Sequence, residues 1–207
     1  MGELTAFELN EFIPKFNLKT YFETGTGMGV SLSHAMRYNF NRLYTIDIDN
    51  DFIQRAKRMY QNDSRLTCIN DFSTKAIKDF VPTLSQEPTL FFLDAHFPGA
   101  DFHKITYEES IRTYKEEAFP LELEINLLKS IRDLTNDVII IDDFVLYDKM
   151  EKEYESVKEG HTWKYDWLQD ELNIKTESSF IYEMFSETHD ITKDLRHQGY
   201  LIITPKK

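Results

Sequence analysis

Short apolar runs alternate along this chain with segments in which apolar residues recur every three or four positions. Runs rich in β-branched and aromatic residues predict strands, and five of them lie at Thr20–Glu23, Leu43–Asp47, Leu66–Ile69, Leu90–Leu93 and Val138–Ile141. The segments between them predict helices at Val30–Phe40, at Phe52–Tyr60 behind a cap at Asp49 or Asn50, from a cap at Ser73 to Val81, and from Pro120 to Leu134. The pattern therefore predicts an α/β protein.

The repeated alternation of strand and helix also predicts how the strands pair. Parallel strands need crossover connections, and strands this apolar must be covered on both faces. We therefore expect a Rossmann-like, doubly wound sheet with helices on both faces. Near the end of the chain, Phe180–Phe185 and Tyr200–Thr204 predict two further strands with a polar loop between them. They would form a terminal antiparallel hairpin and bring the sheet to seven strands.

Two long segments fit neither pattern. Residues 97–119 and 147–170 are charged and aromatic, and the second contains Trp163 and Trp167. Loops of this length are more often lids or binding loops than plain connections. We expect a single domain over residues 1–207, with these two segments as lid or substrate loops. Their aromatic residues could equally form a substrate wall, the interface of a homodimer, or a simple hydrophobic patch.

Composition limits the compartment and the partners. No apolar run is long enough to cross a bilayer, and the first residues, Met1-Gly2-Glu3-Leu4, lack the features of a secretory signal. Cys68 is the only cysteine, which excludes an internal disulfide and a cysteine-built metal site. We therefore expect a cytoplasmic protein with no membrane partner. The formal net charge of −12 disfavours nucleic acid, which requires a cationic face, and favours a small-molecule partner.

The first candidate for chemistry is the glycine-rich turn after the first predicted strand, Glu23-Thr24-Gly25-Thr26-Gly27-Met28-Gly29. Glycines there let the backbone approach a ligand closely. The dinucleotide fingerprint would require glycine at position 30, which is Val30, and no P-loop lysine follows. Asp47 ends the next strand, where a carboxylate can accept both hydroxyls of a ribose.

In these residues the chain resembles the class I S-adenosylmethionine-dependent methyltransferases, over Tyr21 to about Phe144. The resemblance implies that S-adenosylmethionine is the cofactor. It implies that Glu23 faces the amino-acid end of the cofactor, that Gly25 and Gly27 line its sugar, and that Asp47 holds the ribose. By the same resemblance Asp71 would accept from the adenine, and Thr26, Ile48 and Asp94 would also contact the cofactor. The alternative is a flavodoxin-like or dehydrogenase-type sheet whose glycines only make a turn.

Further aspartates follow the fourth and fifth predicted strands. Asp94 ends the fourth strand, and Asp142 and Asp143 end the fifth. Because these ends are neighbours in a parallel sheet, the three carboxylates should converge, and a hard divalent cation would neutralise them. This arrangement is similar to metal-dependent small-molecule O-methyltransferases, which implies a Mg²⁺ site. The alternative is that these aspartates cap helices.

His96 is the candidate general base or substrate contact, two residues after Asp94. The sequence departs here from the plant-type enzymes, which carry a lysine at this point. The leading hypothesis is a Mg²⁺-assisted O-methyltransferase that acts on a hydroxyl of a small sugar- or polyol-like molecule, with Asp94 and His96 as catalytic residues. The alternatives are a metal-independent N- or carboxyl-methyltransferase that uses His96, and a non-catalytic binding subunit with the same fold. An NAD-linked oxidoreductase is disfavoured by Val30.

Overall fold

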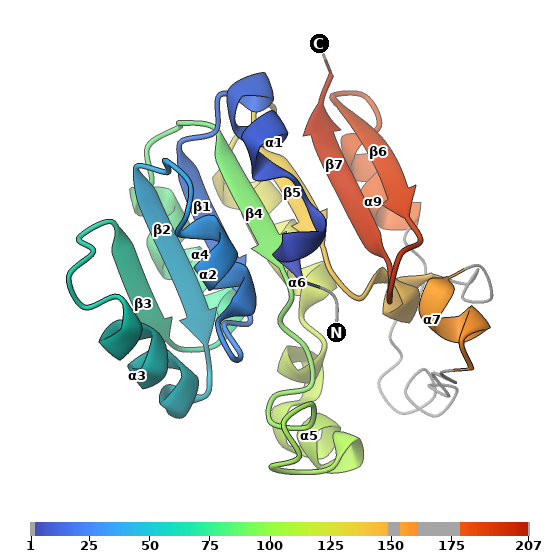
Figure 1. The fold of residues 1–207 in the computed structure, drawn as a ribbon. Helices are drawn as coiled ribbons and strands as arrows, with labels where there is room; N and C mark the ends of the chain where they lie inside the picture. The colour runs from blue at the N-terminus through green and yellow to red at the C-terminus, as the bar shows by residue number, and fades with distance from the viewer. Residues whose placement is uncertain (1–2, 149–153, 161–178, 207) are drawn as a thin grey trace.

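The sheet has seven strands in the order β3-β2-β1-β4-β5-β7-β6 (Figure 1). The computed structural model describes residues 3–148, 154–160 and 179–206. The strands β1 to β5 are parallel, and β7 runs antiparallel to both β5 and β6. Their bounds are β1 Thr20–Thr24, β2 Arg42–Asp47, β3 Leu66–Asn70, β4 Thr89–Leu93, β5 Val138–Ile141, β6 His189–Asp194 and β7 Tyr200–Pro205. The predicted Rossmann-like sheet with a terminal antiparallel hairpin is confirmed.

Helices cover both faces of the sheet, as predicted (Figure 1). The α-helices are α1 Leu9–Phe16, α2 Val30–Ala35, α3 Asn50–Met59, α4 Ser73–Phe80, α5 Tyr107–Tyr114, α6 Leu121–Ile131, α7 Glu155–Lys158 and α9 Ser179–Phe185. Short 3₁₀ turns lie at η1 Leu4–Ala6, η2 Val81–Thr83, η3 Lys115–Ala118 and η4 Phe144–Tyr147. Among the described residues, no helix combines the length and the apolar character that a membrane crossing requires.

The core is divided in two by the sheet, because successive side chains of a strand point to opposite faces. Phe22, Phe91 and Ile139 lie in the cluster that α4, α6 and α9 cover. Their sequence neighbours Tyr21, Phe92 and Ile140 lie in the cluster that η1, α1 and α2 cover. All six side chains are almost completely buried. This two-sided burial explains why β4 and β5 are nearly continuous apolar runs.

The prediction of a strand at Phe180–Phe185 was wrong, because this segment is helix α9. Ile181 and Phe185 are its buried residues, and they are four positions apart, on one face of a helix. The first strand of the hairpin is instead β6, whose sequence His-Asp-Ile-Thr-Lys-Asp is polar. β6 lies at the edge of the described sheet, where it pairs with β7, so it does not need the apolar pattern of a central strand.

Other differences concern helices. Helix α1 was not predicted, and the segment 97–119 contains α5, which begins at a capping box formed by Thr106 and Glu109. Ser73 was expected to cap α4 but is its first residue. Of the two residues expected to cap α3, Asp49 and Asn50, Asp49 is the cap. Helix α2 ends at Ala35, five residues before the predicted Phe40. Phe40 is nevertheless buried, so the apolar pattern continues beyond the end of the helix.

The segment predicted at 147–170 is described only in part. Tyr147 belongs to η4, and residues 155–158 form α7. Trp163 and Trp167, which were candidates for the substrate wall, lie outside the described residues.

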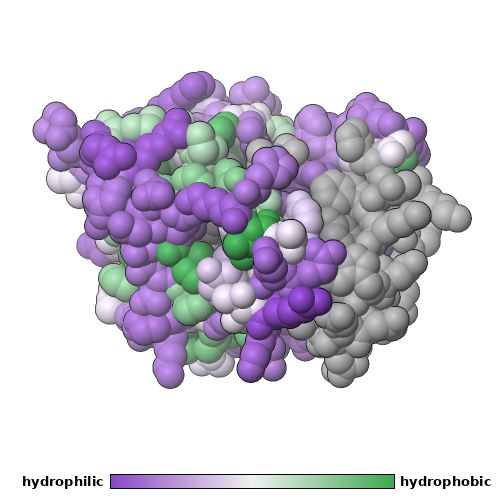
Figure 2. All heavy atoms as spheres, turned by 90° about the horizontal axis from the view of Figure 1, so that it is seen from below, coloured by the Kyte–Doolittle hydropathy of each residue, from purple (hydrophilic) through white to green (hydrophobic). Residues whose placement is uncertain are grey.

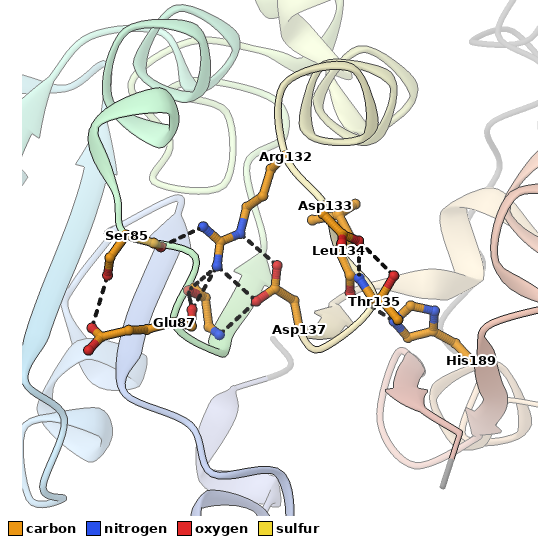
Figure 3. A network of polar contacts seen from close by, with 9 residues as sticks. Ser85, Glu87, Arg132, Asp133, Leu134, Thr135, Asp137 and His189 are labelled. Atoms are coloured by element: carbon orange, nitrogen blue, oxygen red, sulfur yellow. Dashed lines mark hydrogen bonds and ion pairs between the residues drawn. The ribbon is translucent and has the colours of Figure 1, made fainter.

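A buried ion pair stabilises the amino-terminal ends of β4 and β5 (Figure 3). Arg132 donates to Asp137 over 2.7 Å, and both side chains are 1 % exposed. Arg132 also donates to the carbonyls of Ser85 and Glu87, and Asp137 accepts the backbone N–H of Thr89. Because these bonds join the turns before two neighbouring strands, they set the register at the end of the sheet opposite the predicted site.

Candidate active site

A cavity opens at the carboxyl ends of the parallel strands. It is lined by the loops that follow β1, β2 and β4, by Asp71 after β3, and by Asp143 after β5. Figure 2 looks onto this edge of the sheet, where hydrophilic residues cover most of the coloured surface and small hydrophobic patches lie among them. Gly25, Thr26, Gly27, Asp47, Ile48, Asp71, Asp94, His96 and Asp143, all predicted site residues, line the cavity.

The glycine loop holds the β1 end of this cavity in a fixed shape. Gly25 has a φ of +81°, and a Cβ placed there would lie 2.4 Å from the carbonyl oxygen of Asp94. Only glycine fits at this position. The backbone N–H of Gly27 donates to Asp47 Oδ2 over 2.9 Å, and the N–H of Asp49 donates to Asp47 Oδ1 over 2.8 Å. Burial raises the pKa of Asp47 to about 6, against these two hydrogen bonds, which lower it.

Glu23 does not line the cavity, in contrast to the expectation that it faces the cofactor. Its carboxylate accepts hydrogen bonds from the hydroxyls of Tyr21 and Thr45, each over 2.5 Å. The hydroxyl of Thr45 lies 2.6 Å from that of Thr26 in the glycine loop. Burial raises the pKa of Glu23 to about 7. Glu23 is therefore connected to the glycine loop through hydrogen bonds that run by way of Thr45 to Thr26, and it does not contact the cavity itself.

His96 lies among three carboxylates at the β4 and β5 end of the cavity. Its Nε2 is 3.1 Å from Asp143 Oδ2 and 3.3 Å from Asp101 Oδ2, and its Nδ1 is 3.7 Å from Asp94 Oδ1. Burial opposes the charged imidazolium, but the hydrogen bond to Asp143 and the charges around it raise the pKa of His96 to about 9. Burial and the neighbouring Asp142 and Asp143 raise the pKa of Asp94 well above its usual range.

Asp94, His96 and Asp143 each offer one ligand atom, and these atoms lie within 4.8 Å of one another. Asp142, which was expected to be a third carboxylate ligand, is not part of this group and does not line the cavity. Its Oδ1 accepts the backbone N–H of Asp143 over 2.7 Å. Successive residues at a strand end project in different directions, so the group contains one aspartate of the pair, and its third member is His96.

Comparisons with known proteins bear on the fold. No family model and no curated protein matches the chain. Among solved structures, a protein of Staphylococcus aureus assigned as a caffeoyl-CoA O-methyltransferase matches with a TM-score of 0.57 and 12 % identity, over 98 % of this chain and 82 % of that one. A methyltransferase of Geobacter sulfurreducens matches with a TM-score of 0.51 and 11 % identity, over 96 % and 76 % of the two chains.

An rRNA methylase of Streptococcus thermophilus matches with a TM-score of 0.50 and 9 % identity, over 96 % and 95 % of the two chains. Proteins described as acting on different acceptors thus have folds similar to that of this chain. The chain has the class I S-adenosylmethionine-dependent methyltransferase fold. In this methyltransferase fold the cavity lies where α/β sheets bind ligands, outside the carboxyl ends of the strands.

The segment after β4, predicted as a lid or substrate loop, brings to the cavity two residues, Asp101 and Phe102, that were not predicted individually. Asp101 contacts His96 and accepts a hydrogen bond from the Tyr107 hydroxyl over 2.8 Å. The ring of Phe102 packs against Phe52, with ring centroids 4.4 Å apart, and lies over Gly27. The length of the segment, its charged and aromatic residues and its position after a strand end predicted a substrate loop, but no motif marked these two residues within it.

Glu3 and Glu117 also line the cavity and were not predicted. Glu117 accepts a hydrogen bond from the hydroxyl of Thr74 in α4. Glu3 is held by its backbone N–H, which donates to the Tyr200 hydroxyl over 2.9 Å. Glu117 lies within the segment 97–119 that was predicted as a lid or substrate loop, whereas Glu3 lies in the amino-terminal segment, where no motif indicated a function.

Proposed function

We propose that this chain is an S-adenosylmethionine-dependent methyltransferase that methylates a hydroxyl group of a small, polyol-like molecule with the help of a divalent cation. The observation that carries the proposal is that one cavity joins two sites. The glycine loop with Asp47 lies at one end, and the Asp94–His96–Asp143 cluster lies at the other. A cofactor and an acceptor bound there would face each other in one space.

The residues at the first end fit the cofactor. The absence of a side chain at Gly25 keeps the backbone of the loop close to that of Asp94, and the carboxylate of Asp47 is held ready by two backbone N–H groups. Each carboxylate oxygen can accept a further hydrogen bond, so Asp47 can still bind ribose hydroxyls. Asp71 lines the same region and would accept from the adenine. S-adenosylmethionine, when bound, supplies a methyl group on a positively charged sulfur.

The residues at the second end fit a cation. Asp143 is buried, and its Oδ1 has no hydrogen-bond partner among the described residues. A cation held by Asp94 and Asp143 would act as a Lewis acid that lowers the pKa of a substrate hydroxyl. The protein would contribute mainly positioning, because the acceptor oxygen must lie in line with the methyl group.

The lining of the cavity limits the acceptor. Eight carboxylate residues line it, and no lysine or arginine does so among the described residues. Such a surface repels phosphates and coenzyme A esters, whereas a neutral polyhydroxy compound can donate hydrogen bonds to the carboxylates or bind to a cation. This charge pattern supports a sugar- or polyol-like acceptor.

The geometry disfavours the metal-independent alternative with His96 as base. Both ring nitrogens of His96 face carboxylates: Nδ1 faces Asp94, and Nε2 faces Asp143 and Asp101. A base needs a nitrogen lone pair that is free to accept a proton from the acceptor.

The test has two steps. Titration calorimetry with S-adenosylhomocysteine should show binding at micromolar or lower Kd, and the absence of binding would favour a non-catalytic subunit. Methyl transfer from labelled S-adenosylmethionine to a panel of sugars and polyols should then stop with a chelator and recover with a divalent cation. Asp94→Asn and Asp143→Asn should each lower turnover at least about tenfold, whereas the exposed control Asp133→Asn should not. Chelator-resistant turnover would contradict the role of the cation.

A further inference from the structure

We infer that the cation site of the proposed methyltransferase takes a transition-metal ion of the Zn²⁺ or Co²⁺ kind in preference to Mg²⁺, with the imidazole of His96 as one of its ligands. The role of the site in catalysis rests on the proposed function. The preference for the metal does not, because it follows from the side chains that surround the site.

The donor set is the first argument. The group that can converge on one ion consists of two carboxylates and one imidazole, from Asp94, Asp143 and His96. Mg²⁺ takes oxygen ligands and retains several waters. Imidazole nitrogen is a softer donor that suits Zn²⁺, Co²⁺ and Fe²⁺, and affinity for a mixed nitrogen and oxygen site rises along the transition series. Asp142, the oxygen donor that would have completed an all-carboxylate site, lies outside the group.

The second argument is an unsatisfied buried group. Asp143 is 4 % exposed and lines the cavity. Its Oδ2 contacts His96 over 3.1 Å, while its Oδ1 has no hydrogen-bond partner among the described residues. A buried carboxylate oxygen without a partner is costly unless an ion or a ligand binds it.

The third argument, from the charge around His96, supports a bound dication, and the donor set decides which kind. Asp94, Asp101 and Asp143 all face the ring. When they are ionised, an imidazolium leaves two negative charges uncompensated, whereas a dication bound to a neutral imidazole leaves one. A metal ion therefore neutralises the cluster more completely than a proton on His96 does.

The experiment compares the binding of different metal ions to the metal-free protein. Titration calorimetry should give a Kd for Zn²⁺ at least about a hundredfold below that for Mg²⁺. X-ray absorption at the zinc edge, at one equivalent of Zn²⁺, should show the outer-shell scattering of an imidazole ligand. This measurement needs no variant, so it also decides the outcome if substitutions prevent folding.

Matched variants identify the histidine. His96→Asn should lose the imidazole scattering and weaken Zn²⁺ binding at least about tenfold. His103→Asn, a substitution at an exposed histidine of the same loop, should leave both unchanged. Equal affinities for Mg²⁺ and Zn²⁺, a zinc spectrum with oxygen neighbours only, or unchanged Zn²⁺ binding by His96→Asn would each overturn the inference.

S-adenosylhomocysteine is titrated into the same samples, so that the two proposals are tested separately. Binding of this ligand without a preference for Zn²⁺ would overturn the metal inference and leave the methyltransferase proposal intact. A histidine-ligated Zn²⁺ site without binding of S-adenosylhomocysteine would support the metal inference and contradict the methyltransferase proposal.

Discussion

Gly25 shows how much one residue without a side chain contributes to the cavity. Gly25→Ala places a methyl group 2.4 Å from the Asp94 carbonyl oxygen at a φ of +81°. Steric overlap and left-handed strain together should cost about 2–5 kcal/mol of stability and weaken S-adenosylhomocysteine binding. Gly29→Ala is the matched control, since Gly29 has a φ of +80° but no atom within 4 Å of an added Cβ. It should cost only about 1–2 kcal/mol in urea unfolding. Equal losses would contradict the close approach.

Glu124 is a buried acid whose charge opposes folding. Burial raises the pKa of Glu124 to about 7, against hydrogen bonds from Ser73 and Thr24 that lower it. A folded-state pKa above the unfolded value means that the folded protein binds more protons, so this residue contributes stability below pH 4.5 that is lost as the pH rises through about 7.

Glu124→Gln removes this titration. The variant should gain stability over the natural protein as the pH rises from about 5 to 8, by up to roughly 3 kcal/mol. Urea unfolding at several pH values measures the difference. Glu122→Gln, a substitution at an exposed residue of the same helix, should show no such trend. A constant difference for Glu124→Gln would contradict the shifted pKa.

Among the elements, β4 and β5 depend on the Arg132–Asp137 pair at their amino-terminal ends. Asp137→Ala leaves a guanidinium that is 1 % exposed without its counter-charge, so it should cost roughly 3–5 kcal/mol in denaturant unfolding. Asp133→Ala, a substitution at an exposed residue of the same turn, should cost less than about 1 kcal/mol. The affinity for S-adenosylhomocysteine should be unchanged in both variants, because the cavity lies at the opposite ends of the strands.

At the scale of the whole molecule, hydrogen bonds connect the amino-terminal segment to β7, the last strand along the chain. The Tyr200 hydroxyl in β7 accepts from the backbone N–H of Glu3 over 2.9 Å and donates to its carbonyl over 3.2 Å. Tyr200→Phe should therefore cost about 1–3 kcal/mol, because it leaves backbone groups unsatisfied, and should weaken S-adenosylhomocysteine binding by releasing Glu3. Tyr38→Phe, which removes only a contact of 3.5 Å to His34, should have little effect on either measurement.

The sequence by itself determined the parallel sheet and the edge of the sheet at which the cavity lies. Strands such as Leu90–Leu93 are apolar on both faces, and this pattern arises when helices cover both sides. Gly25 and Asp94 directly follow strands and Asp47 ends one, and parallel strands bring their carboxyl ends to one edge. Local pattern failed at Phe180–Phe185, because a short apolar run fits either a buried strand or a helix face, and at β6, because an edge strand does not need apolar residues.

Only the tertiary structure decided which side chains meet. His96 and Asp143 converge, while Asp142 is turned to a backbone N–H and Glu23 to Tyr21 and Thr45. Asp101 and Glu3 reach the cavity from a loop and from the amino-terminal segment. Strand periodicity specifies where a strand ends. The directions of its last side chains depend on the turn that follows and on packing with distant segments. Those directions determine whether carboxylates alone converge or whether an imidazole converges with them.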